Sequence, residues 1–129
     1  MIYLIDTHAW VEYVIGSTSA VVMKRLFENP KNKFITSECS LAEIRSYCLI
    51  NKRNFEEVYK IVKRNSITLP VLHYHWIEAA KIRFEIRKRV KDFGLIDSIL
   101  VVKQNELKAT IISGDSHFKG QKNVMYIGK

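Results

Sequence analysis

The chain has few cysteines, prolines and glycines: two, two and five in 129 residues. Cys39 and Cys48 lack the Cys-x-x-Cys spacing of a zinc or redox site. On one helix, their nine-residue separation would put them on opposite faces, which makes a disulfide between them implausible. We therefore expect two small core residues. The scarcity of proline and glycine leaves little room for long loops.

Long hydrophobic runs are also lacking. None approaches the roughly 18 apolar residues that a membrane-spanning helix needs. The first residues, Met1 to Asp6, lack the basic segment of a signal peptide and reach a charged side chain almost at once. We therefore expect a cytoplasmic protein that does not associate with membranes.

Acidic residues are outnumbered, with 13 Asp and Glu against 21 Lys and Arg, which gives a net charge of +8. Such a basic chain favours a polyanionic partner, and nucleic acid more than lipid. The content of hydrophobic residues, 47%, is ordinary for a globular protein and excludes a disordered one. The length predicts a single domain over residues 1–129.

Short apolar runs rich in β-branched residues alternate with longer helical patterns. The predicted strands cover 2–5, 34–36, 67–69, 110–112 and 124–127. The predicted helices cover 7–15, 19–29, 41–50, 55–62, 74–91 and 95–107. Strands that are apolar on both sides and separated by helices predict an α/β fold, with a parallel sheet between two helical layers. In such folds the functional site lies at the carboxyl ends of the strands.

Three of the four aspartates stand at structurally notable positions, two of them directly after predicted strands. Asp6 follows the first strand, Asp115 follows the fourth, and Asp97 interrupts an apolar run near a helix start. Each has an ordinary alternative: a helix cap for Asp6, a favourable first-turn charge for Asp97 and a side-chain turn or cap for Asp115. Glu43 could complete a capping box that begins at Ser40.

Together these carboxylates suggest a site that binds a divalent metal ion. Carboxylates close together repel, so that without a counter-ion some would hold a proton. Mg²⁺ or Mn²⁺, which prefer oxygen ligands, would remove that conflict. An acidic pocket on a basic protein suits the cleavage of a phosphodiester, because the surface attracts the polyanion and the metal lets its phosphate approach.

Four segments in order resemble the motifs of PIN-domain nucleases and, within that family, of VapC-type toxin ribonucleases. They are Leu4 to Glu12, Thr36-Ser37 with Leu41 to Ile44, Gly94 to Leu100, and Ile112 to Phe118. The resemblance implies a three-layer α/β/α sandwich and an RNA endonuclease that uses Mg²⁺ or Mn²⁺. It implies an acidic quartet for catalysis and metal binding, made of Asp6, Glu43, Asp97 and Asp115.

Two further residues follow from the resemblance. Ser113 matches a small hydroxyl residue near the metal. His8 stands where the family usually has Asn or Ser, and could hydrogen-bond the Asp6 carboxylate, contact the scissile phosphate or face solvent. In our hypothesis, Asp6, Asp97 and Asp115 hold an ion that activates a water, while Glu43 completes the site or helps to hold a second ion.

Basic residues cluster at 81–91, where six Lys and Arg oppose Glu85 alone. Most of these should simply form a solvated helix face. Lys119 and Lys122, and from the cluster Arg87 and Arg89, are candidate contacts to RNA phosphates. His73 and His75 resemble a metal pair, but no carboxylate or Cys lies nearby in sequence, which favours packing at a helix start.

The resemblance also implies partners: RNA, a small antitoxin protein that fills the acidic pocket, and a second copy of the chain in a homodimer. Two alternatives remain at this point. One is a PIN nuclease of RNA processing without an antitoxin. The other is a non-catalytic PIN module that binds RNA or protein, although the intact quartet speaks against it.

Overall fold

A computed structural model describes residues 1–128, so that Lys129, the last residue of the predicted single domain, lies outside it. The strands are β1 (Ile2–Ile5), β2 (Lys33–Ser37), β3 (Ile67–Leu69), β4 (Thr110–Ser113) and β5 (Val124–Tyr126). They form one parallel sheet in the order β3-β2-β1-β4-β5. This confirms the predicted parallel sheet.

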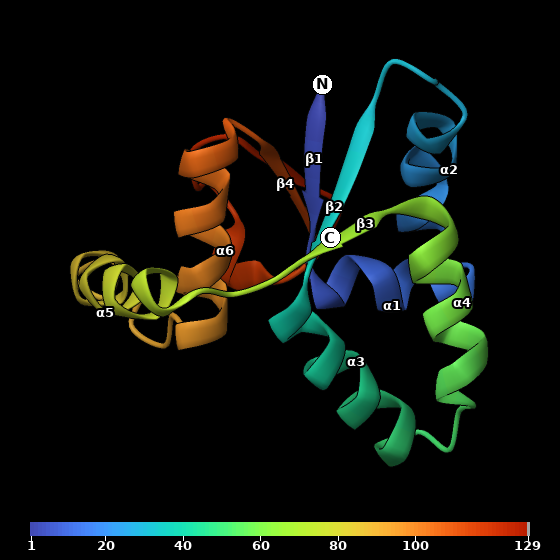
Figure 1. Ribbon diagram of the computed structural model, residues 1–129, viewed down its shortest axis with the longest axis horizontal. Coiled ribbons are helices and arrows are strands. Elements are labelled where there is room, and N and C mark those ends of the chain that lie inside the picture. The colour runs from blue at the N-terminus through green and yellow to red at the C-terminus, as the bar shows by residue number, and fades with distance from the viewer. Residues whose placement is uncertain (129) are drawn as a thin grey trace.

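Helices cover both faces of the sheet (Figure 1). They are α1 (Thr7–Ile15), α2 (Val21–Phe27), α3 (Glu38–Ile50), α4 (Phe55–Asn65), α5 (His73–Ile86) and α6 (Leu95–Leu107). Two short 3₁₀ helices, η1 (Thr18–Ala20) and η2 (Ser116–Phe118), complete the elements. Helices α1 to α4 lie on one side of the sheet and α5 and α6 on the other, as an α/β/α sandwich requires. Within residues 1–128, no helix is both long and apolar enough to cross a membrane.

The central strand β1 shows why its sequence is apolar throughout. Tyr3 and Ile5 belong to the core cluster under α1 to α4, which also contains Trp10. Leu4 points to the opposite face and packs in the cluster that contains Leu100 of α6. Successive side chains of a strand alternate between faces, so that a sheet covered on both sides needs apolar residues at every position.

The predicted helix over 74–91 is too long at its end, because α5 stops at Ile86. The chain then turns, with the Arg87 Nε donating to the Phe93 carbonyl at 2.7 Å. This turn delivers Phe93 to the core, where it is fully buried. The basic run therefore does not form one continuous helix face.

Three other helices differ from their predicted bounds, and one of them is α4, which continues to Asn65 rather than ending at 62. Helix α3 begins at Glu38 rather than at 41, and the predicted helix over 19–29 is divided into η1 and α2. Helix α2 ends at Phe27, and a turn follows in which the Asn29 side-chain oxygen accepts from the Lys31 amide at 3.0 Å. On α3, Cys48 is buried as expected, whereas Cys39 is half-buried with Sγ 3.2 Å from the Ser37 hydroxyl; both cysteines are free.

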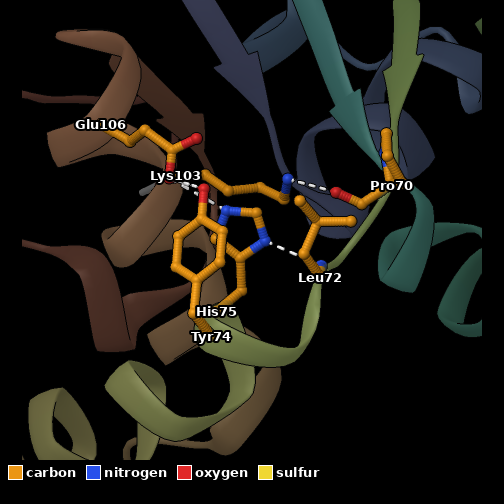
Figure 2. A network of polar contacts seen from close by, with 6 residues as sticks. All are labelled: Pro70, Leu72, Tyr74, His75, Lys103 and Glu106. Carbon is orange, nitrogen blue, oxygen red and sulfur yellow. Dashed lines mark hydrogen bonds and ion pairs between the residues drawn. The ribbon is translucent and has the colours of Figure 1, made fainter.

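A polar network fastens α5 to α6 (Figure 2). His75 is buried, accepts from the Leu72 amide at Nδ1 and contacts the Glu106 carboxylate of α6 through Nε2 at 3.0 Å. The Tyr74 hydroxyl donates to the same carboxylate and lowers its pKa. Lys103, also buried, donates to the Pro70 carbonyl at 2.6 Å. His75 is thus a packing residue as predicted, and its carboxylate partner comes from another helix.

Candidate functional site

A cavity of about 370 Å³ opens at the carboxyl end of the sheet. It is lined by Asp6, Thr7, His8, Val11, Glu43, Tyr47, Asp97 and Asp115. The tertiary structure therefore brings all four predicted acidic residues to one cavity, although they are far apart in the sequence. The N-cap position of α1 directly after β1, helix α3, helix α6 and the segment after β4 each supply one of them.

Asp6 is the most deeply buried of the four, with 4% of its surface exposed. Its Oδ1 accepts from the Ala9 amide at 2.8 Å and so caps α1. Its Oδ2 accepts from the Ser113 hydroxyl at 2.5 Å. The helix-cap interpretation is therefore right, and it is compatible with a place in the cavity.

Ser113 connects two of the aspartates. It ends β4 and is fully buried, and its hydroxyl donates to Asp6 while accepting from the Asp115 amide at 3.0 Å. The Asp115 side chain in turn caps η2 by accepting from the His117 amide at 2.9 Å. One hydroxyl therefore fixes the end of β4 against the end of β1.

Glu43 reaches the cavity from the second turn of α3. The predicted capping box is wrong, because the helix begins at Glu38 and its N-cap is Ser37. Instead, the Thr7 hydroxyl donates to Glu43 Oε1 at 2.7 Å across 36 residues of sequence. Thr7 was not predicted as a site residue, although its position directly after Asp6 was a signal in the sequence.

Asp97 lies in the first turn of α6, as expected from its position near the helix start. One ligand atom each of Asp97, Asp115 and His117 lie within 4.8 Å of one another. His117 Nδ1 is 2.9 Å from Asp115 Oδ1. His117 was not singled out from the sequence, although its position two residues after Asp115 could have drawn attention to it.

The electrostatics of the cavity favour a cation. Burial raises the pKa of Asp6 to about 7, and the nearby carboxylates of Asp97 and Asp115 add to this effect. Burial also raises the pKa of Asp97 to about 6, again with help from its acidic neighbours Asp115 and Glu43. Carboxylate oxygens with one imidazole nitrogen form a donor set that suits a divalent ion such as Mg²⁺ or Mn²⁺. The residues present therefore fit such an ion.

His8 is exposed at the rim of this cavity. Among the described residues, it has no hydrogen bond to Asp6, whose two carboxylate oxygens are occupied by Ala9 and Ser113. Its ring packs so closely on Gly114 that a Cβ on that residue would lie 2.6 Å from Nδ1. A side chain at position 114 would therefore displace the His8 ring from its present position.

None of the four predicted phosphate-binding cations lines the acidic cavity. Arg87 holds the turn after α5, and the Arg89 guanidinium donates to the Gln121 side chain at 3.3 Å. Lys122 precedes β5 and lines, with Arg89, a cavity between α5 and α6. The Lys119 ammonium lies 5.8 Å from the centre of the Tyr126 ring.

Solved structures of similar fold include a chain of the VapBC2 complex of Rickettsia felis bound to a promoter DNA fragment, with a TM-score of 0.75 and 18% identity over 98% of this chain and 97% of that one. Mycobacterium tuberculosis VapC20, a toxin that cleaves the sarcin-ricin loop, has a TM-score of 0.74 and 15% identity, over 95% of this chain and 96% of that one. A chain of VapBC-1 from nontypeable Haemophilus influenzae has a TM-score of 0.71 and 17% identity over the whole of both chains. At these identities the likeness shows the fold alone.

No curated protein matches the chain. The family model of the PIN domain, however, matches residues 3–122, nearly the whole sequence, and its range includes the four acidic residues of the cavity. The chain therefore belongs to the PIN-domain family.

Proposed function

We propose that the protein is a metal-dependent endoribonuclease, the toxin of a type II toxin–antitoxin pair, which hydrolyses RNA phosphodiester bonds in the cytoplasm. The observation that carries this proposal is the convergence of Asp6, Glu43, Asp97 and Asp115 on one cavity of a chain with a net charge of +8. The PIN family supports a nuclease. Toxin–antitoxin complexes among the proteins of similar fold support the proposal that this nuclease is a toxin.

The proposed mechanism assigns the metal to Asp6, Asp97 and Asp115, with His117 close enough to join them. A divalent ion at such a site lowers the pKa of a bound water and stabilises negative charge on the phosphate. Ser113 holds the Asp6 carboxylate in place, and Thr7 does the same for Glu43. Thr7 occupies one oxygen of Glu43; the second has no hydrogen bond among the described residues, and we propose that it completes the site.

Two protein partners belong to the proposal. A small antitoxin would cover the acidic cavity, and a second copy of the chain would form a homodimer. The antitoxin is expected to block both cleavage and metal binding when it is added to the purified protein. Light scattering on the free protein would measure whether it pairs.

The direct test is cleavage of mixed tRNA and mRNA by the purified protein, with Mg²⁺, with Mn²⁺ or with EDTA. We expect cleavage that requires metal and disappears in Asp97→Asn, because this variant loses a charged ligand while keeping the shape of the side chain. The variant also controls for a contaminating nuclease. A folded, antitoxin-free protein that leaves all RNA intact with both metals would overturn the proposal.

The imidazole near the aspartates predicts a preference between the two ions. Mg²⁺ strongly prefers oxygen ligands, whereas transition metals accept imidazole more readily. We expect cleavage with Mn²⁺ to exceed cleavage with Mg²⁺ at equal concentration, and His117→Ala to reduce this ratio by about 10-fold, equivalent to about 1.4 kcal/mol. Rates measured against the concentration of each metal would check this. An unchanged ratio in His117→Ala would show that His117 is not a ligand.

A further inference from the structure

A second cavity, of about 330 Å³, adjoins the acidic one. His8 lines both cavities, and Gly114, which lies between Ser113 and Asp115, lines the second. The remaining wall comes from Glu12 of α1, the hydroxyl run Ser17 to Ser19 before α2, and the chain after β5. A molecule whose phosphate lies in the acidic cavity could therefore extend past His8 into this one.

The second cavity is lined by two residues whose side-chain oxygens have no hydrogen-bond partner within residues 1–128, Glu12 and Ser17. The Ser17 hydroxyl oxygen is buried and has no hydrogen bond among the described residues. The Glu12 carboxylate likewise has no side-chain partner within residues 1–128, and no lysine or arginine lines the cavity. The Glu12 carboxylate can therefore accept hydrogen bonds from a ligand in this cavity, whereas the Ser17 oxygen is too deeply buried to reach one.

The chemistry of the lining identifies the ligand. The negative charge of Glu12, with no lysine or arginine among the described residues that line the cavity, would repel a phosphate. A carboxylate accepts hydrogen bonds, so it selects a group that donates them. Single-stranded RNA is read through the hydrogen-bonding edges of its unstacked bases and through stacking on rings such as imidazole.

We propose that this cavity binds the base of a nucleotide next to the scissile phosphate, and that Glu12 selects guanine. Guanine presents two adjacent donors, N1–H and the 2-amino group, which match the two oxygens of one carboxylate. His8, which lines both cavities, separates base from phosphate and offers its ring for stacking. The inference rests on the proposed function for its substrate, while the binding of the base can be measured by itself.

The first experiment measures binding without cleavage. The ¹⁵N-labelled protein is titrated in Mg²⁺ with the 5′-monophosphates of guanosine, adenosine, cytidine and uridine, and with inosine monophosphate, which lacks the 2-amino group. We expect the guanosine nucleotide to shift the amide signals of Ser17, Gly114 and Gly128, and the inosine nucleotide to bind about 10-fold more weakly. Glu12→Gln should abolish this difference. Glu28→Gln, an exposed glutamate outside both cavities, is the matched control and should keep it.

The second experiment maps the cleavage sites of wild type and both variants on a single-stranded RNA of mixed sequence. Cuts next to guanine that lose this preference in Glu12→Gln support the proposal. Cleavage with no guanine bias, or equal shifts of these amides by all the nucleotides, overturns it and leaves the proposed nuclease standing. Guanosine nucleotide binding in this cavity without any RNA cleavage would instead overturn the nuclease and keep the base site.

Discussion

Asp6→Asn is expected to lower the rate of RNA cleavage by about a thousandfold or more. The aspartate lies at the centre of the acidic cavity, and its carboxylate is held by the Ala9 amide and the Ser113 hydroxyl. Asparagine keeps the shape but removes the charge that attracts the cation. A catalytic metal contributes several kilocalories per mole of charge stabilisation, and each 1.36 kcal/mol corresponds to a factor of ten in rate. Initial rates at saturating metal would measure the loss.

The same substitution is expected to stabilise the metal-free protein at neutral pH. The pKa of Asp6 is raised from 3.8 to about 7 by burial, so the folded state binds a proton that the unfolded state has released. The free energy of unfolding of the wild type should therefore fall as the pH rises from about 4 to about 7. Asparagine has no proton to lose, so Asp6→Asn should not show this pH-dependent fall. Its free energy of unfolding at pH 7.5 should exceed that of the wild type by about 2 kcal/mol, which raises the Tm by several degrees.

Thermal unfolding in EDTA and in Mn²⁺ at several pH values would test this pair of effects. In the wild type, Mn²⁺ should raise the Tm more at pH 7.5 than at pH 5, because protons compete with the metal at the lower pH. Asp92→Asn, at the exposed aspartate outside the cavity, is the matched control and should change neither rate nor Tm. Full cleavage activity in Asp6→Asn would show that this cavity is not the nuclease site.

Trp10→Ala is expected to have the largest effect on folding, lowering the free energy of unfolding by about 3–5 kcal/mol. Trp10 is fully buried beneath α1, with its ring stacked on Phe27 at a centroid distance of 5.9 Å. Its Nε1 donates to the Thr36 hydroxyl of β2 at 3.0 Å. Alanine loses this contact and leaves a cavity under the helix that carries Asp6, Thr7 and His8 at its start.

Urea unfolding followed by circular dichroism would measure this effect. Trp76→Ala, at a tryptophan on α5 that is 40% exposed, is the matched control and should cost much less. The loss of unfolding free energy in Trp10→Phe should lie between those of Trp10→Ala and Trp76→Ala. Phenylalanine keeps most of the apolar volume, and the Thr36 hydroxyl still pairs with Ser66 at 2.7 Å. A Trp10→Ala variant as stable as the wild type would contradict the complete burial of Trp10 in the core.

Much of the fold could be predicted from sequence because the local patterns agree with the tertiary structure. The run Ile2 to Ile5 is apolar at every position, which is typical of a strand covered on both faces, and β1 has these bounds. Helix bounds were less predictable. No glycine or proline marks the end of α5 at Ile86, and the turn after it depends on a hydrogen bond from Arg87 to Phe93, which the sequence pattern does not reveal.

The sequence by itself predicted the parallel sheet and the place of Asp6 and Asp115 at its edge, because strands of one direction bring residues at their carboxyl ends to the same edge. Glu43 and Asp97, which lie on helices, were predicted from the resemblance to the PIN-domain family. Only the tertiary structure decided what surrounds the four carboxylates. The contact of Thr7 with Glu43, the approach of His117 to Asp115 and the placing of His8 between two cavities each depend on side chains from separate elements. It also placed Arg89 and Lys122 away from the acidic cavity, since Lys122 lies just before β5, at the opposite end of the sheet. Periodicity along a chain reports which face a residue occupies, whereas the neighbours across that face are set by packing.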